Sequence, residues 1–274
     1  MINGVQTELI SVRDRALQYG DGCFETLRII ARKPILVSEH LLRLQSTCRL
    51  LRIKLDDAAL STELAEFLHN CPPDGILKII ITRGIGGRGY SAPKQLSANR
   101  ILQYSPFPDD YLIKACNGVS IGISEHKLFS NSALAGIQHL NRLDQVMASF
   151  ALDDSVDEAL CLNQSGQVIE GTKSNLILVV GQRLVTPLLG DAGVKGIMLD
   201  YLTGRFEESG HTIQVEAVSI ADVNEASELF LCNSVFGVWP VRKLCRNASV
   251  QAWTIGPYTQ LAMRFNHELI NRAN

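Results

Sequence analysis

Apolar residues along the chain recur at two different spacings, and the spacing changes repeatedly from one segment to the next. A spacing of three to four residues places side chains on one helical face, and it predicts helices over residues 41–51, 60–68, 140–150, 196–208 and 258–270. Alternating or β-branched runs predict strands over residues 77–82, 100–104, 119–124, 158–162, 175–180 and 228–232. Together these elements indicate a mixed α and β protein.

A proline-containing segment, Ser105-Pro-Phe-Pro-Asp-Asp110, interrupts both kinds of pattern. Its two prolines fix φ and remove hydrogen-bond donors that a helix or a strand needs. The length of 274 residues also suits two domains, at roughly 150 residues per domain. We therefore expect an α/β (α+β) fold with a small N-terminal domain over residues 1–105, an interdomain linker over residues 106–116 and a larger, β-rich C-terminal domain over residues 117–274.

The charge balance excludes one class of partner. Lys and Arg number 26 and Asp and Glu number 28, which gives a net charge of −2. A chain this close to neutral has no general electrostatic attraction to nucleic acid. No apolar run approaches the roughly 18–20 residues that span a bilayer, and the first residues contain no apolar signal segment. We expect neither a nucleic-acid partner nor a membrane span.

Cysteine and histidine usage indicates neither a disulfide framework nor a metal site. The seven cysteines are odd in number, widely spaced and lack a Cys-x-x-Cys pair. The six histidines are scattered and form no His-Glu-x-x-His motif. We expect reduced thiols, a cytoplasmic location and no bound metal.

Gly84-Ile-Gly-Gly-Arg-Gly89 follows a predicted strand and matches the G-x-G-x-x-G pattern. A dinucleotide site needs this loop to open a helix, but Pro93 follows closely and argues against one. Glycines allow close backbone approach, and arginine binds carboxylates through two hydrogen bonds. The loop therefore either carries Arg88 and Tyr90 to a ligand or is a solvated hairpin loop, and the pattern favours neither.

Two further segments hold candidate polar groups. Glu170 ends a predicted strand, and small polar residues lead from it to Asn175 at the start of the next. This arrangement suits a carboxylate that holds a cation, although a simple turn between two strands has the same pattern. Gly193-Val-Lys-Gly196-Ile-Met precedes a helix, where free backbone N–H groups favour an anion; the alternative is plain helix entry. Ser234 follows a buried strand and either adds a donor or forms a turn.

Taken together and in order, these segments resemble the fold-type-four, pyridoxal-phosphate-dependent family of branched-chain and D-amino acid aminotransferases. The resemblance spans nearly the whole chain. It is carried by four motifs: Asp14-Arg-Ala-Leu-Gln-Tyr-Gly-Asp-Gly-Cys-Phe24, Glu39-His-Leu-Leu-Arg43-Leu, Glu170-x4-Asn175 and Gly196-Ile-Met. The family implies a two-domain fold with pyridoxal 5'-phosphate between a small N-terminal and a larger C-terminal domain, in a homodimer.

Within this family, three stretches are similar to the aminodeoxychorismate lyases: residues 19–24, 82–91 and 134–145. The likeness implies conversion of 4-amino-4-deoxychorismate into 4-aminobenzoate and pyruvate, on the route to folate. Glu25, directly after the first stretch, is more like the D-amino acid branch. A D-amino acid or branched-chain aminotransferase is therefore the alternative enzyme.

The resemblance also implies roles for individual residues. Arg43 holds the cofactor phosphate, and Glu170 faces the pyridine nitrogen, where a carboxylate keeps the ring protonated. Arg88 and Tyr90 lie near the substrate carboxylates. The remaining residues implied to bind the cofactor are Asn175, Gly196, Ile197, Met198 and Ser234.

One position departs from the family. The lysine that forms the Schiff base stands between Gly-Ile and His-Leu-Asn in the family motif, and this chain has Gln138 there. An amide nitrogen shares its lone pair with the carbonyl, so it neither attacks an aldehyde nor takes a proton near neutral pH. Three interpretations follow: an altered copy of an active lyase, a protein that binds cofactor without turnover, or rescue by a nearby lysine. We favour the first, because every other signature is intact.

Overall fold

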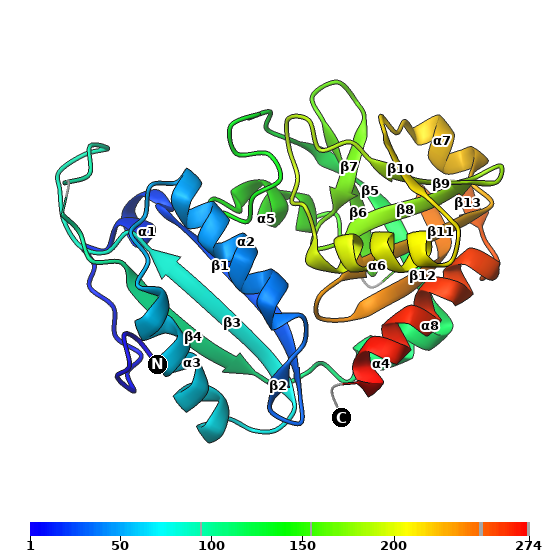
Figure 1. Cartoon of the computed structure of the whole chain (residues 1–274). Helices are drawn as coiled ribbons and strands as arrows, with labels where there is room; N and C mark the ends of the chain where they lie inside the picture. The colour runs from blue at the N-terminus through cyan, green and yellow to red at the C-terminus, as the bar shows by residue number, and fades with distance from the viewer. Residues whose placement is uncertain (94, 154, 247–248, 273–274) are drawn as a thin grey trace. The chain divides into compact units, whose positions relative to one another are not determined.

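A computed structural model describes residues 1–272 except 94, 154 and 247–248, and the chain forms two compact units (Figure 1). The N-terminal unit comprises Met1–Phe107 together with Gln138–Asn141. The C-terminal unit comprises Pro108–Ile137 and Arg142–Arg272. The chain passes from the first unit to the second between Phe107 and Pro108, within the segment expected as a linker, but helix α4 (Asp110–Asn117) occupies that segment from Asp110 onwards.

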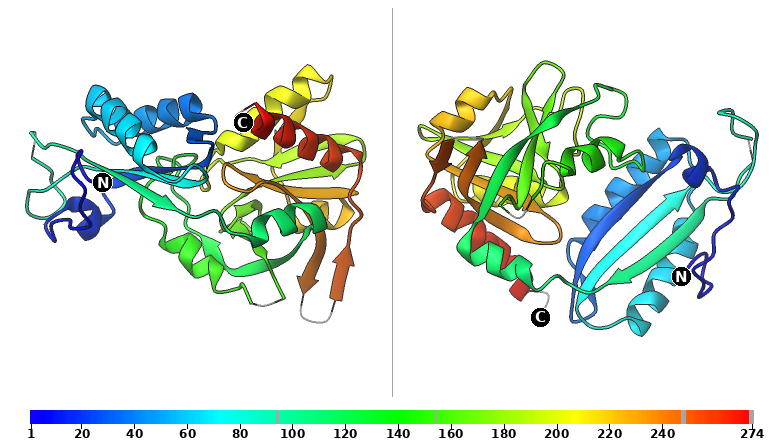
Figure 2. Two further views of the ribbon diagram at one scale, coloured as in Figure 1. Left: turned by 90° about the horizontal axis from the view of Figure 1, so that it is seen from below. Right: turned by 180° about the vertical axis from the view of Figure 1, so that it is seen from behind.

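The N-terminal unit is a four-stranded antiparallel sheet in the order β2-β1-β3-β4, with two helices on one face (Figure 2). Alternate residues of β1, from Cys23 to Ile29, are buried beneath helix α2 and form the core with the inner face of β3. Period-two alternation places Glu25 on this buried face among apolar side chains. The elements are α1 (Arg15–Tyr19), β1 (Gly22–Ile30), β2 (Lys33–Pro34), α2 (Val37–Leu50), α3 (Asp57–Asn70), β3 (Gly75–Thr82) and β4 (Asn99–Ser105).

The C-terminal unit is built on a nine-stranded mixed sheet in the order β10-β9-β8-β11-β12-β5-β6-β7, with β13 paired to β12. Helices α6 and α8 pack together on one side, around Phe206, Phe230 and Phe265. A second core surrounds Trp239 and Trp253. The strands are β5 (Val119–Leu128), β6 (Glu158–Asn163), β7 (Val168–Gly171), β8 (Asn175–Val180), β9 (Arg183–Pro187), β10 (Ile213–Glu216), β11 (Glu228–Asn233), β12 (Gly237–Arg246) and β13 (Ser249–Ala252). The further helices are α5 (Leu143–Ser149), α6 (Ile197–Glu208), α7 (Ile220–Glu225) and α8 (Pro257–Asn271).

Most predicted helices and strands are confirmed, but the helix expected over residues 140–150 is wrong at its start. Helix α5 begins at Leu143, and the backbone N–H of Leu140 instead donates to Gly22 at 3.0 Å. The apolar stripe is also not a core face, since Leu143 is 71% and Phe150 72% exposed. The spacing of three to four residues correctly predicts a helix here, but contacts distant in sequence decide where the helix begins and which of its residues are buried.

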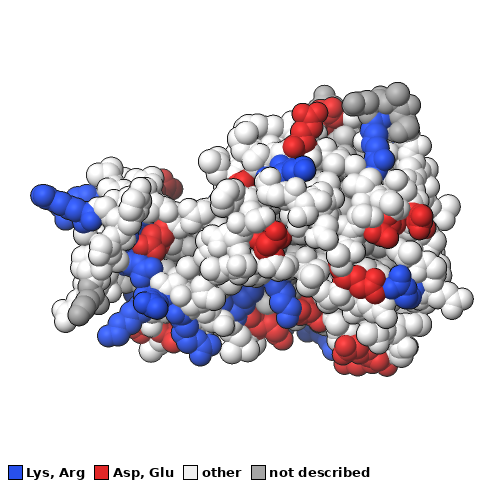
Figure 3. Space-filling view, turned by 90° about the horizontal axis from the view of Figure 1, so that it is seen from above, with Lys and Arg blue, Asp and Glu red and all other residues white. Residues whose placement is uncertain are grey.

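Charged side chains of both signs are interspersed over the face shown in Figure 3. Across the residues that the structure describes, no helix is long and apolar enough to cross a membrane. In the same residues, no group of three or more His, Cys, Asp or Glu side chains is arranged to hold a metal ion.

Candidate active site

Four polar side chains meet in the N-terminal unit. The Glu25 carboxylate, 1% exposed, accepts hydrogen bonds from Arg43 Nε to Oε1 at 2.8 Å and from Arg43 Nη2 to Oε2 at 2.6 Å. Nδ1 of His40 lies 2.6 Å from the same Oε2. Arg43 Nη2 also donates to Oε1 of Gln138. The cluster therefore joins the predicted phosphate-binding arginine to the residue at the lysine position.

Local sequence explains how these side chains converge. His40 and Arg43 stand three residues apart on α2, so both lie on the face that covers β1. Gln138 comes from a segment that pairs with the start of β1: the N–H of Phe24 donates to the Gln138 carbonyl at 3.0 Å. A Cβ at Gly22 would lie 2.3 Å from the Ile81 carbonyl oxygen of β3, so the neighbouring strand requires glycine there. A Cβ at Gly20 would lie 2.4 Å from Asn141 Oδ1, so the first glycine of the Gly-Asp-Gly motif makes room for the segment that carries Gln138.

A second polar cluster lies in the C-terminal unit, around Glu170 at the end of β7. Oε2 accepts the backbone N–H of Val194 at 2.8 Å, and Oε1 accepts Nε2 of Gln145 at 3.2 Å. Burial raises the pKa of Glu170 to about 7, against the lowering effect of these two donors and of the Arg142 charge. A further N–H donor at this carboxylate would lower the pKa of Glu170 again, because a hydrogen bond to the carboxylate favours its ionised form.

The N-terminus of α6 adjoins Glu170 through the same loop. Asn175 Nδ2 donates to the Val194 carbonyl at 2.9 Å, two residues before the helix N-cap, Gly196. A Cβ at Gly196 would lie 1.9 Å from Asn175 Oδ1, so this close approach requires glycine. Gly196 provides no side-chain cap for the first turn of the helix. The buried helix start at Ile197 and Met198 therefore presents backbone N–H groups suited to an anion.

The structure brings some predicted residues together and leaves others apart within their units. Glu170 and Asn175 both bond to the backbone of Val194, two residues before Gly196, so the structure brings these three residues together. The same segments also form the simple turn and the helix entry that the sequence pattern left open as alternatives. Ser234 lies in the tight turn between β11 and β12, half-buried. Its neighbour Asn233 accepts the N–H groups of residues 235 and 236, both at 2.9 Å.

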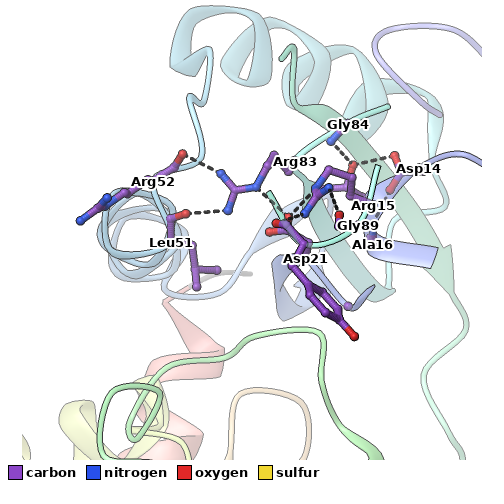
Figure 4. Close-up of polar contacts among 12 residues, drawn as sticks. Asp14, Arg15, Ala16, Asp21, Leu51, Arg52, Arg83, Gly84 and Gly89 are labelled. Atoms are coloured by element: carbon purple, nitrogen blue, oxygen red, sulfur yellow. Dashed lines mark hydrogen bonds and ion pairs between the residues drawn. The ribbon is translucent and has the colours of Figure 1, made fainter. Parts of the chain in front are cut away.

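In the residues described between β3 and β4, the Gly-rich loop opens no helix, as Pro93 predicted. Arg88 is exposed and Tyr90 is 89% exposed. Beneath the loop, two arginines are directed at the Asp21 carboxylate, Arg15 at 2.8 Å and Arg83 at 2.7 Å (Figure 4). The loop is therefore held at its base, while both candidate side chains remain exposed.

Sequence reasoning missed one fully buried carboxylate. Glu158, 0% exposed, accepts hydrogen bonds from the Thr172 N–H at 2.7 Å, from the Thr172 hydroxyl and from the Ser174 hydroxyl at 3.2 Å. It thereby shapes the turn between Glu170 and Asn175. A lone acid that opens an otherwise apolar strand was the available signal, because a buried charge needs partners.

The two-unit α/β architecture is that of a fold-type-four protein, as comparison with known proteins shows. The chain belongs to the class IV aminotransferase family, whose model matches residues 22–244. An aminodeoxychorismate lyase from Vibrio harveyi is 31% identical over 260 residues, which cover 94% of this chain and 96% of that protein.

Solved structures give the same result. The crystal structure of 4-amino-4-deoxychorismate lyase from Pseudomonas aeruginosa superposes with a TM-score of 0.92 at 41% identity, covering 99% of this chain and 98% of that one. The PLP-bound form of a hypothetical aminotransferase from Mycobacterium tuberculosis shares the fold, with a TM-score of 0.80 at 19% identity and coverage of 98% and 95%.

Proposed function

We propose that this chain is of the aminodeoxychorismate lyase type: a pyridoxal-phosphate-dependent lyase framework for converting 4-amino-4-deoxychorismate into 4-aminobenzoate and pyruvate, in which Gln138 replaces the reactive lysine. The observation that carries the proposal is the buried Glu170 carboxylate beside the uncapped start of α6. Likeness over nearly the full chain to two lyases supports it.

The residues present fit the cofactor. Glu170 would accept the ring N–H, because each of its oxygens accepts one hydrogen bond in the structure and has room for one more. The backbone N–H groups of Ile197 and Met198 would hold the phosphate, and Arg43 and Ser234 are the further phosphate ligands that the family resemblance implies. When bound, the cofactor supplies a protonated ring that withdraws electrons from the substrate.

The chain's other residues orient these groups. Val194 and Gln145 hold the Glu170 carboxylate in one direction, and Asn175 fixes the loop before the helix start. Glu25 fixes the Arg43 guanidinium through two hydrogen bonds. Arg88 and Tyr90 would bind the substrate carboxylates. An exposed arginine on a glycine-rich loop is able to donate two hydrogen bonds to one carboxylate.

Gln138 limits what this chain does with the cofactor. Its amide neither forms a covalent bond to the cofactor nor moves a proton, and Arg43 already donates to its oxygen. We infer noncovalent cofactor binding and turnover reduced by at least about 10²–10⁴, the worth of one positioned acid–base group. If the loss of turnover is complete, this chain is the cofactor-binding protein without turnover that the sequence left open as an alternative.

Rescue by another lysine has little support. Lys195 is 65% exposed in its side chain and lies 3.2 Å from Asp200. Lys127 donates to the Gln164 carbonyl at 3.4 Å, and Lys173 lies 5.8 Å from the centroid of the Trp239 ring. Each of these lysines has partners within the C-terminal unit, and a misplacement of about one ångström already costs ~10²-fold in rate.

We also propose a homodimer. Large apolar side chains stand exposed in the N-terminal unit, with Leu9 at 84% and Val12 at 76%, and again on α5 and just after it, with Leu143 and Phe150. The proposal rests on the family resemblance, and these exposed apolar side chains are candidates for the surface that a second copy would cover. Sedimentation equilibrium tests the proposal: a measured mass equal to that of one chain at micromolar concentration contradicts it.

We propose a cytoplasmic location from the number and spacing of the seven cysteines.

The deciding experiment compares three proteins: the chain as it is, Gln138→Lys, and Gln138→Arg as a control that adds charge but no nucleophile. Gln138→Lys is expected to release 4-aminobenzoate and pyruvate from aminodeoxychorismate, while the other two proteins release little or none. If Gln138→Lys instead exchanges amino groups between D-amino or branched-chain amino acids and keto acids, the protein is an aminotransferase framework.

A further inference from the structure

The Gly-rich loop is anchored from beneath by one buried side chain. Arg15, 3% exposed, donates from Nη1 to the Gly89 carbonyl at 3.1 Å and from Nη2 to the Tyr90 carbonyl at 2.9 Å. Its own backbone N–H donates to the Gly84 carbonyl at 3.0 Å. One residue thus contacts the loop at its start and at the two positions that follow Arg88.

We propose that Arg15 is a positioning residue, which holds the Gly-rich loop in the one conformation that presents Arg88 and Tyr90 to an anionic substrate. The inference rests on the proposed function for the role of these two side chains. It adds a residue that touches neither substrate nor cofactor and acts through the loop backbone.

The loop needs an external anchor because its own backbone is permissive. Gly84, Gly86, Gly87 and Gly89 all have positive φ, in a region that glycine enters at little cost and leaves as readily. A planar guanidinium supplies what such a loop lacks, since its parallel N–H groups reach two successive carbonyls at once. A lysine carries its three donors on a single nitrogen, so its ammonium does not occupy the separate positions from which Nη1, Nη2 and Nε of Arg15 reach the two carbonyls and Asp21.

The anchor is itself held rigidly. Arg15 Nε donates to Asp21 Oδ2 at 2.8 Å, and Arg83 Nε donates to the same oxygen at 2.7 Å (Figure 4). Burial acts to raise the pKa of Asp21, but the hydrogen bonds and charges of the two arginines outweigh it and keep the pKa below its ordinary value. Asp21 therefore stays ionised and fixes the direction of the Arg15 side chain.

Side-chain packing around the Arg15 guanidinium also supports its role as the anchor of the loop. The Arg15 guanidinium lies 4.9 Å from the centroid of the Tyr19 ring, and that ring meets the Tyr90 ring edge-on at 5.6 Å. A Cβ at Gly87 would lie 2.8 Å from Pro93 and 3.3 Å from Arg15 Nη1. Gly87, Gly89 and Tyr90 of the loop thus all lie close to the guanidinium, whereas the Arg88 side chain is exposed.

Arg83 provides a matched control. It shares the Asp21 carboxylate with Arg15, but its remaining donors go to the carbonyls of Leu51 at 2.7 Å and Arg52 at 2.8 Å, at the end of α2. Arg83→Lys and Arg15→Lys therefore make the same chemical change on the same carboxylate. Only Arg15→Lys releases the loop carbonyls, and both variants keep a cation beside Asp21 so that the unit folds.

The first measurement uses the chain as it is and requires no catalysis. We expect trypsin to cleave after Arg88 about tenfold faster in Arg15→Lys, and at the parental rate in Arg83→Lys, because a fixed loop fits a protease poorly. Equal cleavage rates in Arg15→Lys and the parent overturn the proposal.

The second measurement places both variants in Gln138→Lys. We expect Arg15→Lys to raise KM for the carboxylate substrate about tenfold with kcat within about twofold, the pattern of lost substrate binding. Arg83→Lys should change neither. A fall in kcat at constant KM, or equal effects of both variants, overturns the proposal. If Gln138→Lys exchanges amino groups instead, the proposed function fails, and KM is compared with the amino acid that it uses as substrate. If Gln138→Lys is inactive, the rate of trypsin cleavage after Arg88 decides whether Arg15 anchors the loop.

Discussion

Arg43 and Glu25 are joined by two parallel hydrogen bonds, Nε to Oε1 at 2.8 Å and Nη2 to Oε2 at 2.6 Å. The pair lies on the buried face of β1, and the carboxylate also contacts His40. A residue that resembles the D-amino acid branch in sequence is therefore, in this fold, the support of the predicted phosphate-binding arginine. The first prediction follows from this pair.

Glu25→Gln removes the buried charge that compensates Arg43. We expect a loss of about 3–5 kcal/mol in the free energy of unfolding, because the guanidinium is left without its counter-charge. Urea unfolding at pH 7 measures the loss. Glu39→Gln, an exposed change on the same helix α2, is the control and should stay within about 0.5 kcal/mol of the parent. A Glu25→Gln midpoint equal to the control's contradicts the prediction.

Glu170 predicts a specific pH dependence of stability. Its pKa is about 7 in the folded chain against an ordinary 4.5, so the folded state holds this proton more tightly than the unfolded state. In the cofactor-free protein, its effect on the free energy of unfolding is nil below pH 4.5 and grows unfavourable as the pH rises to 7. The total is about 3 kcal/mol.

Glu170→Gln carries no such titration. We expect the variant to gain stability relative to the parent between pH 4.5 and pH 7, and to bind pyridoxal phosphate more weakly, since its amide oxygen is a weaker acceptor for a charged ring N–H. Thermal unfolding across pH and a fluorescence titration with the cofactor measure the two effects. A constant stability difference over that pH range would falsify the pKa assignment.

Two glycines of one helix separate a packing requirement from helix propensity. Gly196→Ala places a Cβ 1.9 Å from Asn175 Oδ1, so we expect it to destabilise the protein and to displace the loop at Asn175. Gly204→Ala, inside α6 where a Cβ meets no atom within 4 Å, should stabilise by about 0.5–1 kcal/mol. Guanidinium unfolding of both variants tests this; stabilisation by both changes rules out the close contact.

The chain as it is should bind pyridoxal phosphate without a covalent bond. Borohydride treatment followed by intact mass measurement is expected to show no added cofactor, whereas Gln138→Lys treated in the same way gains one, because only an amine bonds to the aldehyde. Cofactor fixed to any lysine of the unaltered chain contradicts the assignment of Gln138. Peptide mapping then identifies which of Lys127, Lys173 and Lys195 carries it.

Local features of the site were predictable from neighbouring residues. Glu170 and Asn175 lie five residues apart at a strand end and the following turn, and Gly196 lies directly before a helix, and each of these local features is visible in the pattern. Helices α2, α3, α6 and α8 were predicted from their apolar spacing, since a helix face is encoded over a few turns. The loop after β3 was predicted to open no helix, because Pro93 follows the glycines.

The contacts between distant residues were decided only by the tertiary structure. The partners in the Arg43–Gln138 hydrogen bond are 95 residues apart, and those in the Arg15–Gly89 hydrogen bond are 74 apart. Pattern along the chain says which face a side chain occupies, but it does not say which other segment covers that face. Glu25 shows the difference: no strand was predicted over residues 22–30, and the structure places Glu25 on the buried face of β1, where Arg43 of α2 supplies the charge that makes a buried carboxylate tolerable.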